Sequence, residues 1–540
     1  MRTEAWYAKH TKTLTSDDEA QLLRLIQEAA GLSPFGATDM ARLLRKYPRA
    51  AGQFAKDQIV AAYRRFCDDG RLTFDRETLR RLQMKPTRTI SGVATVTVLT
   101  KPFPCPGECI FCPTDVRMPK SYLADEPGAI RAEYHKFDPY ETTASRIRAL
   151  ENIGHATDKI ELLILGGTWS YYPLDYQEWF IRRCLDAMNG VDSDSLEEAQ
   201  RLNETAARRN VGLVVETRPD YVDAAEARRL RRYGVTKVQL GAQSLDDRIL
   251  DLNKRGHTVE QTRQAVKLLR AAGFKLHLHW MPNLLGATPE SDLADFEKLW
   301  SDPGLRPDEL KIYPCSLVRE AELVKWWERG RGAYRPYADD ELIWLLAECM
   351  AHTPKYVRLS RVIRDIPAGH IVAGSTASNL REVVERKLTA EGRPCQCIRC
   401  REVRGEKVNG DWRLEIESYA TTGGQECFLS FVTETGKLAG FLRLSLPIPE
   451  AVALTGIEEL RGAAIIREVH VYGPVVRIGE GADRGEAQHL GLGAQLIREA
   501  ERRASEAGYQ RLVVISAIGT REYYRKQGFE TGELYMGKDL

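Results

Sequence analysis

Residues 93–113 read VATVTVLTKPFPCPGECIFCP, an apolar β-rich run followed at once by three cysteines. The spacing C-x3-C-x2-C sets Cys105, Cys109 and Cys112 in one short loop. Because four cysteines saturate a [4Fe–4S] cluster, three thiolates would leave one iron open to a substrate. A structural zinc site or a redox loop would also use cysteines, but neither explains their position directly after a strand. We therefore expect a reactive iron–sulfur cluster here.

Apolar runs alternate with amphipathic stretches from about residue 90 to residue 315, which predicts a series of strands and helices. Six consecutive strand and helix pairs favour parallel strands with right-handed crossovers, so the economical fold is a partial (βα)6 barrel. Reactive groups in such barrels gather at the carboxyl ends of the strands, where the cysteine loop lies. The predicted strands are VATVTVL (93–99), IELLIL (160–165), VGLVVE (211–216), VTKVQL (235–240), FKLHLHW (274–280) and DELKIY (308–313).

The chain has 540 residues, 43% of them hydrophobic and 29% charged, which is too long for one hydrophobic core. It contains neither an 18-residue apolar run nor an apolar leader, so we expect a cytoplasmic protein without a membrane partner. We predict an α/β multidomain fold. Its four regions are a basic helical region (1–88), the barrel (89–315), a linker with a metal-binding cysteine loop (316–410) and an α+β domain of short strands and one strong helix (411–540).

The ends of the later strands carry groups that suit a ligand. The second strand ends in ILGGTWS, where Gly166 and Gly167 let the backbone approach a ligand closely, before Thr168. Polar side chains at other strand ends could bind a cofactor or could equally be hydrogen-bonded core residues. They are Glu216, Arg218, Gln239, Gln243 and His279.

A second cysteine group follows the barrel. Cys395, Cys397 and Cys400 form C-x-C-x2-C, which favours a structural zinc ion. A closed tetrahedral site needs a fourth ligand, and Cys315 at the end of the sixth strand is the candidate. A second iron–sulfur cluster or buried free thiols are the alternatives.

The last region contains a glycine pattern at the start of a helix. Gln488, Gly491 and Gly493 form Q-x-x-G-x-G, with Leu492 and Ala494 between and after the glycines. Backbone N–H groups and the helix dipole at such a start can hold a pyrophosphate. Tyr524 lies shortly before Gly528-Phe529, and we expect its neighbour Tyr523 to be the core residue of the pair.

Basic residues are concentrated near the amino terminus, although the formal net charge is only +2. Met40 to Phe66 contains seven Lys or Arg and one acidic residue, Asp57. Such a segment could contact RNA phosphates, and a solvated helix face is the alternative. The candidate residues are Arg42, Arg45, Lys46, Arg49, Lys56, Arg64 and Arg65, with a second patch predicted at Arg358, Arg361 and Arg364.

The cysteine spacing, with Phe111 before the last cysteine, resembles the radical S-adenosylmethionine (radical SAM) superfamily, and the carboxyl-terminal pattern resembles the GNAT acetyltransferase fold. Over nearly its whole length the sequence resembles the family of elongator protein three, the catalytic subunit of Elongator. The shorter cysteine spacing is similar to the bacterial and archaeal members, which act without the other Elongator subunits. The stretches that carry the resemblance are RTISGVATVTVLTKPFPCPG, ILGGTWS, REVHVYGPVV, QHLGLGAQLIREAE and ISAIGTREYYRKQGF.

The resemblance implies four cofactors: a [4Fe–4S] cluster, S-adenosylmethionine, acetyl-CoA and zinc. It implies that Gly166, Gly167 and Thr168 help to hold S-adenosylmethionine, with Glu216, Gln239 and Gln243 nearby. It also implies that Tyr524 lies beside the CoA sulfur and protonates the departing thiolate. Further residues expected to contact acetyl-CoA are Lys159, Glu468, Val469, His470 and Val471, and Lys159 is expected to be catalytic as well.

By the same resemblance the substrate is the wobble uridine in the anticodon stem-loop of tRNA. The expected product is 5-carboxymethyluridine or its precursor, formed when a SAM-derived radical activates the acetyl group. Three other readings stay open. They are a protein lysine acetyltransferase with a structural cluster, an RNA-binding module with a vestigial cluster, and another radical enzyme such as a methylthiotransferase, which would not need a CoA domain.

Overall fold

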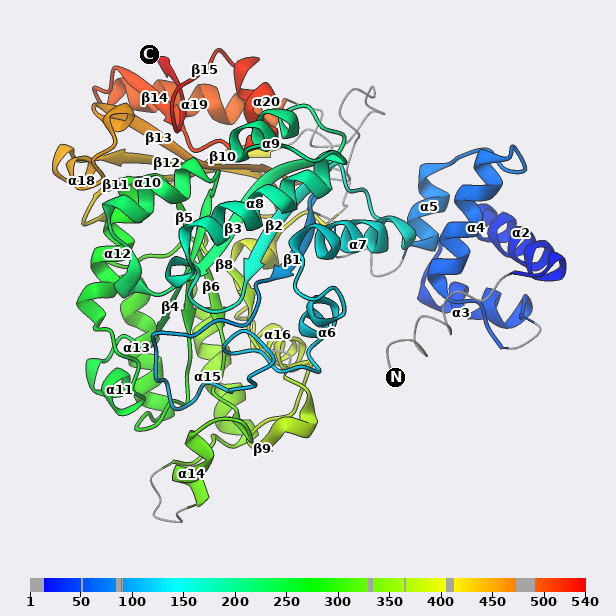
Figure 1. Ribbon diagram of the computed structural model, residues 1–540, viewed down its shortest axis with the longest axis horizontal. Helices are drawn as coiled ribbons and strands as arrows, with labels where there is room; N and C mark the ends of the chain where they lie inside the picture. Colours follow the sequence, from blue (N-terminus) through cyan, green and yellow to red (C-terminus); the bar gives the residue numbers. More distant parts are fainter. Residues whose placement is uncertain are drawn as a thin grey trace.

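The fold was analysed in a computed structural model, in which three parts follow one another along the chain (Figure 1). A helical bundle projects from the side of a central half-barrel, and the carboxyl-terminal sheet covers one end of the half-barrel. The structure describes residues 14–49, 52–83, 89, 91–328, 334–363, 366–404, 412–472 and 491–540.

The amino-terminal bundle has a small core of its own. Thr15 caps its first helix through a capping box with Asp18, which satisfies backbone donors at the helix start. Leu22 and Leu25 of the first helix and Phe66 of the third are fully buried within this core. The helices are α2 (Ser16–Gly31), α3 (Ala37–Lys46), α4 (Lys56–Asp68) and α5 (Arg76–Leu82).

The half-barrel is a parallel sheet of seven strands in the order β1-β2-β3-β4-β5-β6-β8. The six predicted strands are present, and the prediction of a partial barrel is confirmed. The seventh strand lies in the arginine-rich run that the sequence pattern placed in the linker, because a four-residue strand with two arginines gives no apolar signal. The strands are β1 (Ala94–Leu99), β2 (Lys159–Leu165), β3 (Arg209–Thr217), β4 (Lys237–Gln243), β5 (Lys275–Trp280), β6 (Glu309–Ile312) and β8 (Arg358–Arg361).

The two faces of this sheet differ. Val96 and Val98 of β1 are fully buried under the outer helices, whereas Thr95 and Thr97 point into the interior of the half-barrel. Because polar side chains such as these threonines occur on the inner face, the sheet differs from the usual parallel sheet, which is apolar on both faces. The helices between the strands are α6 (Pro127–Tyr134), α7 (Pro139–Asn152), α8 (Leu174–Asn189), α9 (Leu196–Asn203), α10 (Ala224–Arg232), α11 (Asp247–Leu252), α12 (Val259–Ala271) and α13 (Pro289–Ser301).

The segment after β6 links the half-barrel to the last sheet. Ile398 donates its backbone N–H to Val357 beside β8, which ties the second cysteine loop to the edge of the barrel. Its elements are β7 (Leu317–Val318), α14 (Leu323–Glu328), α15 (Asp339–Ala351), β9 (Ile371–Ala373), α16 (Leu380–Ala390) and α17 (Ile398–Arg401).

The carboxyl-terminal sheet has seven strands in the order β10-β11-β12-β13-β14-β16-β15. Its first three strands have ten residues each, longer than the short strands that the sequence pattern predicted. The parallel pair β13–β14 is in register only from Ala463↔Arg511 to Ile466↔Val514, so β13 continues beyond its partner. The elements are β10 (Trp412–Thr421), β11 (Gly424–Thr433), β12 (Leu438–Pro447), α18 (Pro449–Ala453), β13 (Ala463–Val471), α19 (Leu492–Glu506), β14 (Arg511–Val514), α20 (Arg521–Arg525), β15 (Glu530–Thr531) and β16 (Met536–Asp539).

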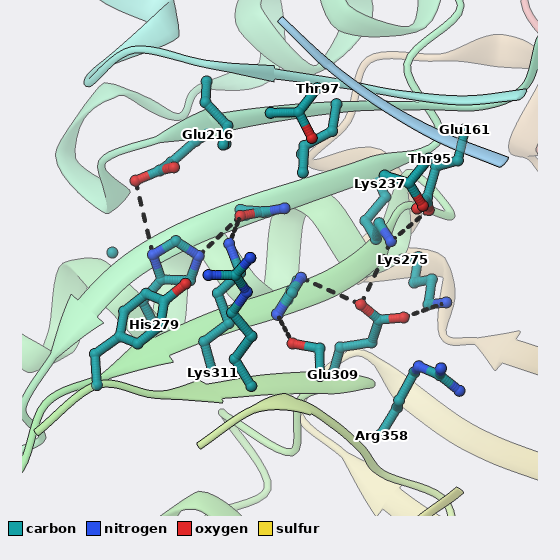
Figure 2. Close-up of a pocket in the computed structure, with 18 of the residues that line it drawn as sticks. Thr95, Thr97, Glu161, Glu216, Lys237, Lys275, His279, Glu309, Lys311 and Arg358 are labelled. Carbon is teal, nitrogen blue, oxygen red and sulfur yellow. Dashed lines mark hydrogen bonds and ion pairs between the residues drawn. The ribbon is translucent and has the colours of Figure 1, made fainter. Parts of the chain in front are cut away.

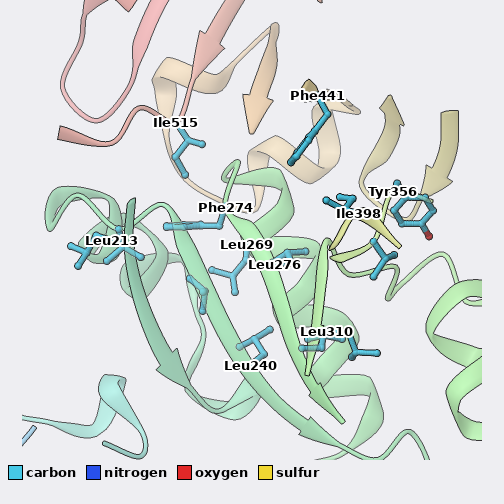
Figure 3. Close-up of a cluster of buried hydrophobic side chains, with 14 of the residues drawn as sticks. Leu213, Leu240, Leu269, Phe274, Leu276, Leu310, Tyr356, Ile398, Phe441 and Ile515 are labelled. Carbon is cyan, nitrogen blue, oxygen red and sulfur yellow. The ribbon is translucent and has the colours of Figure 1, made fainter. Parts of the chain in front are cut away.

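The carboxyl-terminal sheet is docked on the amino ends of the barrel strands. Arg467 of β13 pairs with Asp308 at the start of β6 at 2.7 Å, and both side chains are fully buried. Phe274 before β5 and Ile515 after β14 belong to one hydrophobic core that extends across both parts (Figure 3). None of the helices in the described ranges combines the length and the apolar character that a membrane span requires.

Candidate functional site

A cavity of about 1360 Å³ occupies the interior of the half-barrel. Its wall includes Cys105, Cys109 and Cys112 beyond the carboxyl end of β1. The same wall includes Tyr524 and Ile515 of the carboxyl-terminal part. The two sets of residues that the sequence singled out for chemistry therefore share one cavity.

The first cysteine loop is half-buried and lies between two arginines. Arg255 donates to the Cys109 sulfur at 3.6 Å and to the Gly241 carbonyl oxygen at 2.6 Å. Arg218 lies against Gly107, where an added Cβ would meet its Nη1 atom at 2.3 Å. Two guanidinium groups therefore border the loop that carries the three thiols.

The distances between sulfur atoms differ between the two cysteine groups. The sulfurs of Cys395, Cys397 and Cys400 lie within 4.8 Å of one another, and among the described residues this is the group of three metal-ligand side chains that does so. Zinc–sulfur bonds of 2.3 Å in a tetrahedron place sulfurs ~3.8 Å apart, which fits this group. The sulfurs of the first loop are more widely spread, as ligands at different corners of a cluster must be.

The second loop is buried beside Arg381, whose Nη2 lies 3.4 Å from the Cys400 sulfur. The adjacent cysteines, and then Arg381, lower the pKa of the Cys397 thiol. The structure does not bring Cys315 to this group. Cys315 packs instead with Ile110 and Leu284 in a separate hydrophobic cluster, near the hydroxyl of Tyr334.

The glycine turn after β2 holds backbone that a larger residue would not tolerate. Gly166 has φ +142° and Gly167 has φ +98°. A Cβ on Gly166 would come within 1.8 Å of the Thr100 Oγ1 atom. Thr168 is buried, and its hydroxyl lies 3.8 Å from the Cys105 sulfur, so this turn borders the cysteine loop.

Four neighbouring strands each supply one polar side chain to the cavity. Gln239 Oε1 accepts a hydrogen bond from Lys311 Nζ and lies 2.9 Å from His279 Nε2, with which it also forms a hydrogen bond. The other nitrogen of His279 lies 3.7 Å from Glu216 (Figure 2). The sequence pattern identified three of these residues but missed Lys311, whose place in the alternating run DELKIY was its only signal.

Gln243 Oε1 and Arg218 Nη1 are among the buried polar atoms of the cavity wall that have no hydrogen-bond partner within the described part of the chain. Gln243 also has φ +70°, a strained conformation for a residue other than glycine. Unpaired buried polar atoms are costly, so a polar ligand that bonds to them would stabilise the site. Together with the three cysteines of the first loop, these atoms fit an iron–sulfur cluster and a bound S-adenosylmethionine.

Charged pairs that the sequence did not predict line the amino end of the cavity. Lys237 lies 2.6 Å from Glu161 and 3.4 Å from Glu309. Lys275 lies 2.6 Å from Glu309 and also pairs with Glu468 of β13. Burial alone would raise the pKa of Glu309, but the two lysines hold it well below its usual value. Glu309 therefore remains charged beside the two lysines.

In the carboxyl-terminal part, Gly491 lies directly before α19 and has φ +70°. Leu492, Gly493 and Ala494 are the first three residues of the helix. Gln488 lies outside the described residues. Tyr524 is buried against Phe529 and lines the cavity, and burial raises the pKa of its hydroxyl. The prediction that Tyr523 is the core residue is wrong, because Tyr523 is 40% exposed and its hydroxyl faces Gly493.

The residues expected to contact acetyl-CoA divide into two groups. Glu468, Val469 and His470 line the cavity from the part of β13 that extends beyond β14, and Val471 ends that strand. Lys159 begins β2 opposite Arg209 and lies outside the cavity wall. Burial lowers its pKa.

Comparison with known proteins agrees with this geometry. Residues 104–297 match the family described as the Radical SAM superfamily, and residues 307–390 match the Radical SAM C-terminal domain. The tRNA uridine(34) acetyltransferase of Dehalococcoides mccartyi is 45% identical over 84% of this chain and 99% of its own length. The chain belongs to the elongator protein three family.

Two further members of this family support the assignment. Elongator complex protein 3 of Danio rerio is 37% identical over 86% of this chain and 87% of its own length. The solved structure of archaeal Methanocaldococcus infernus Elp3, with residues 1–46 deleted, is 41% identical, covers 84% of this chain and all of that chain, and has a TM-score of 0.72. The elongator protein three fold thus extends over most of this chain.

The basic surface of this family member is less cationic than its sequence suggests. Lys46 and Arg65 each lie 2.6 Å from an acidic side chain of α2, Glu28 and Glu19 respectively. Arg49 is mostly buried, 3.4 Å from Asp18. Arg42 pairs with Asp39, Arg45 is exposed, and Lys56 and Arg64 are half-buried. The count of charges over residues 40–66 left out the acidic residues of α2, Glu19 and Glu28, and therefore overestimated the positive charge of this surface.

The second arginine patch, predicted next to the barrel mouth, lies only partly at the surface. Arg358 points into the cavity, where it pairs with Glu402 and donates to the Tyr472 hydroxyl at 3.1 Å. Arg361 is exposed at the cavity edge, and Arg364 lies outside the described residues. Placement on a barrel strand, rather than on a helix surface, explains why Arg358 is internal.

Proposed function

We propose that this chain modifies the wobble uridine of tRNA by adding the acetyl carbon of acetyl-CoA to C5, giving 5-carboxymethyluridine. The observation that carries the proposal is the single cavity that reaches both the first cysteine loop and Tyr524. The relatives named tRNA uridine(34) acetyltransferase support the choice of substrate.

The residues at the cluster end would hold two groups. Cys105, Cys109 and Cys112 would bind three irons, and the glycine turn with Gln243 and Arg218 would hold S-adenosylmethionine. Bound there, these groups supply a 5′-deoxyadenosyl radical that can remove a hydrogen atom from the acetyl methyl group. Gln239 and Glu216 lie on neighbouring strands and would orient the ribose hydroxyls or the base.

The other end of the cavity would hold the thioester. The N–H groups at the start of α19 favour a pyrophosphate, and the extended end of β13, Glu468–Val471, offers backbone groups to the CoA arm. The acetyl carbon radical adds to C5, and loss of one electron and of the C5 proton then restores the C5–C6 double bond. An iron–sulfur cluster held by the three cysteines would supply the electron acceptor. Water then cleaves the thioester and supplies the proton for the departing thiolate. Tyr524, whose raised pKa keeps it protonated, can donate a hydrogen bond to the thioester while the acetyl group lies at this end of the cavity.

Two further sites complete the proposal. A zinc ion held by Cys395, Cys397 and Cys400 with a fourth ligand other than Cys315 would stabilise the linker. The exposed basic side chains of α3 and α4, including Arg42 and Arg45, would contact phosphates of the anticodon stem-loop, which presents an unstacked uridine.

Anaerobic reconstitution tests this function. The protein is loaded with iron and sulfide, reduced, and incubated with S-adenosylmethionine, acetyl-CoA and tRNA, and the nucleosides are analysed by mass spectrometry. We expect 5-carboxymethyluridine that depends on S-adenosylmethionine and disappears in Cys109→Ala. Acetylated protein lysines without modified uridine would support an acetyltransferase instead, and tRNA binding without any turnover would support an RNA-binding module.

A further inference from the structure

The two halves of the site lie at opposite ends of the same strands. The cysteine loop follows the carboxyl end of β1, whereas the carboxyl-terminal sheet meets Lys275 and Glu309 at the amino ends of β5 and β6. Strands of six or seven residues separate these ends by about 20 Å. An acetyl group bound beside Tyr524 must cover this distance before a radical at the cluster can reach it.

The interior of the half-barrel, here called the lumen, is open over this distance. Its wall runs from Tyr524 and Val469 at one end, past Thr95 and Thr97 of β1, to the cysteine loop. Closed barrels of eight strands are filled by layers of bulky aliphatic side chains. Here Thr95 and Thr97 of β1 and Lys237 and Gln239 of β4 face inward, beside the leucine Leu163 of β2, which leaves a space lined by both polar and apolar groups (Figure 2).

The lining suits an uncharged, hydrogen-bonding chain. Lys237 and Lys275 are matched by Glu161 and Glu309, so this part of the wall has little net charge although it is strongly polar. The arm of CoA is a narrow chain of methylenes and amides that ends in the acetyl thioester. Threonine hydroxyls can bond to its amides, and no charge needs to be desolvated along the way.

The cluster end of the lumen offers a group for the thioester itself. Lys311 is only 7% exposed, lines the cavity and donates to Gln239. An ammonium has three donors, so Lys311 can also donate a hydrogen bond to a carbonyl oxygen that reaches it from the amino end of the strands. This contact would hold the acetyl methyl group at the level of His279, just beneath the cysteine loop.

We propose that the lumen is the passage between the two sites, through which the acetyl-bearing arm of CoA extends from the carboxyl-terminal sheet to the cluster. The proposal rests on the function proposed above and adds the route. The acetyl group travels as the intact thioester, so no bond is made or broken on the way. Lys311 is then a binding residue for the thioester oxygen, and Thr97 is a wall residue at mid-length.

Obstruction of the lumen tests the passage. Thr97→Trp fills the space at mid-length, and Thr97→Val is its matched control because valine has nearly the size of threonine. Leu163→Trp, from the cavity face of β2, obstructs the same region from another strand, with Leu163→Met as control. Acetyl-CoA binding and cluster content identify any variant that fails to fold.

The first measurement is free of turnover. In protein with a reduced cluster and no S-adenosylmethionine, the paramagnetic iron increases the nuclear relaxation of [methyl-¹³C]acetyl-CoA, and this effect falls with the sixth power of distance. We expect both tryptophan variants to bind acetyl-CoA normally but to lose at least about tenfold of this enhancement, because the acetyl group is held about 20 Å away. The controls keep it.

The second measurement is the modified uridine. The tryptophan variants should still cleave S-adenosylmethionine but should form at least about tenfold less product than their controls. Product and relaxation enhancement that are unchanged in both tryptophan variants would overturn the passage. Absence of modified uridine in the parent protein would instead overturn the proposed function, and the relaxation measurement would still decide the route.

Discussion

Gly166 shows how a single backbone position fixes the cluster end of the site. Its φ of +142° is closed to side chains, and Thr100 fills the space where a Cβ would stand. We expect Gly166→Ala to lower the free energy of unfolding by about 2–4 kcal/mol, backbone strain and the clash together, and to weaken S-adenosylmethionine binding. Urea unfolding and equilibrium binding measure the two effects.

Gly190 provides the control for Gly166. It also has a positive φ, +75°, but no atom within 4 Å of an added Cβ. Gly190→Ala should therefore cost only about 1 kcal/mol and leave binding unchanged. Equal losses in the two variants would show that the turn after β2 has no special role.

His470 gives a residue-level prediction on pH. Burial lowers its pKa to about 4, against 6.5 for an ordinary histidine. Between these values the unfolded chain binds a proton that the folded chain does not, so the free energy of unfolding falls as the pH falls from about 6.5 toward 4. Urea unfolding at pH 7 and at pH 5 measures this effect. We expect the free energy of unfolding to fall by about 1–2 kcal/mol less in His470→Gln than in the parent protein between these two pH values. Parallel pH curves for the two proteins would contradict the lowered pKa.

Site residues could be predicted from the sequence where their spacing was unusual. They could not be predicted where the packing of the fold determines which side chain reaches the cavity. Three cysteines in eight positions identified the first loop from sequence alone. The choice between Tyr523 and Tyr524 depended on which way the short helix α20 faces, which no local pattern encodes. Lys311 and Arg358 reached the cavity because strands alternate, and a lysine or arginine on a strand is ordinarily assigned to the surface.

At the scale of elements, the second cysteine loop holds β8 at the edge of the half-barrel. If Cys395, Cys397 and Cys400 bind zinc, Cys397→Ser should abolish about one zinc per chain, because a structural site needs its full ligand set. Cys427→Ser, at a buried cysteine outside the loop, should keep the metal. Elemental analysis of the purified proteins checks both, and full zinc content in Cys397→Ser would exclude the site.

The strands and helices of the half-barrel were predicted well, since apolar runs and amphipathic stretches alternate clearly. β8 was not, because its four residues contain two arginines and its partner, β6, lies almost fifty residues earlier. The lengths of strands β10–β12 were underestimated for a related reason. Half-buried β10, with a charged residue at Glu415 and at Glu417, gives a weaker apolar signal than its length warrants.

At the scale of the whole molecule, buried charges join the two large parts. Burial alone would raise the pKa of Asp308, but Arg467 and Arg443 lower it strongly, so the pair stays charged. Arg467→Met should cost about 3–5 kcal/mol, because it removes the main partner of a buried carboxylate. Asp308→Asn with Arg467→Met should cost at least about 1 kcal/mol less than the sum of the single changes, as measured by urea unfolding. Additive losses would show that the two residues do not interact.

The arrangement of the parts was beyond the reach of the sequence. Each motif indicated its own chemistry, but nothing in their spacing showed that the carboxyl-terminal sheet covers the amino ends of the barrel strands. That contact depends on pairs such as Lys275–Glu468, almost two hundred residues apart. The shared cavity, and with it the proposed route of the acetyl group, follows from this docking alone.

The central claim is that the methyl group of acetyl-CoA is the target of the radical. Incubation of the reconstituted protein with [methyl-²H₃]acetyl-CoA, S-adenosylmethionine, reductant and tRNA, followed by mass spectrometry of the released 5′-deoxyadenosine, tests it directly. We predict one deuterium in the 5′-deoxyadenosine. Undeuterated 5′-deoxyadenosine formed alongside modified uridine would contradict the account.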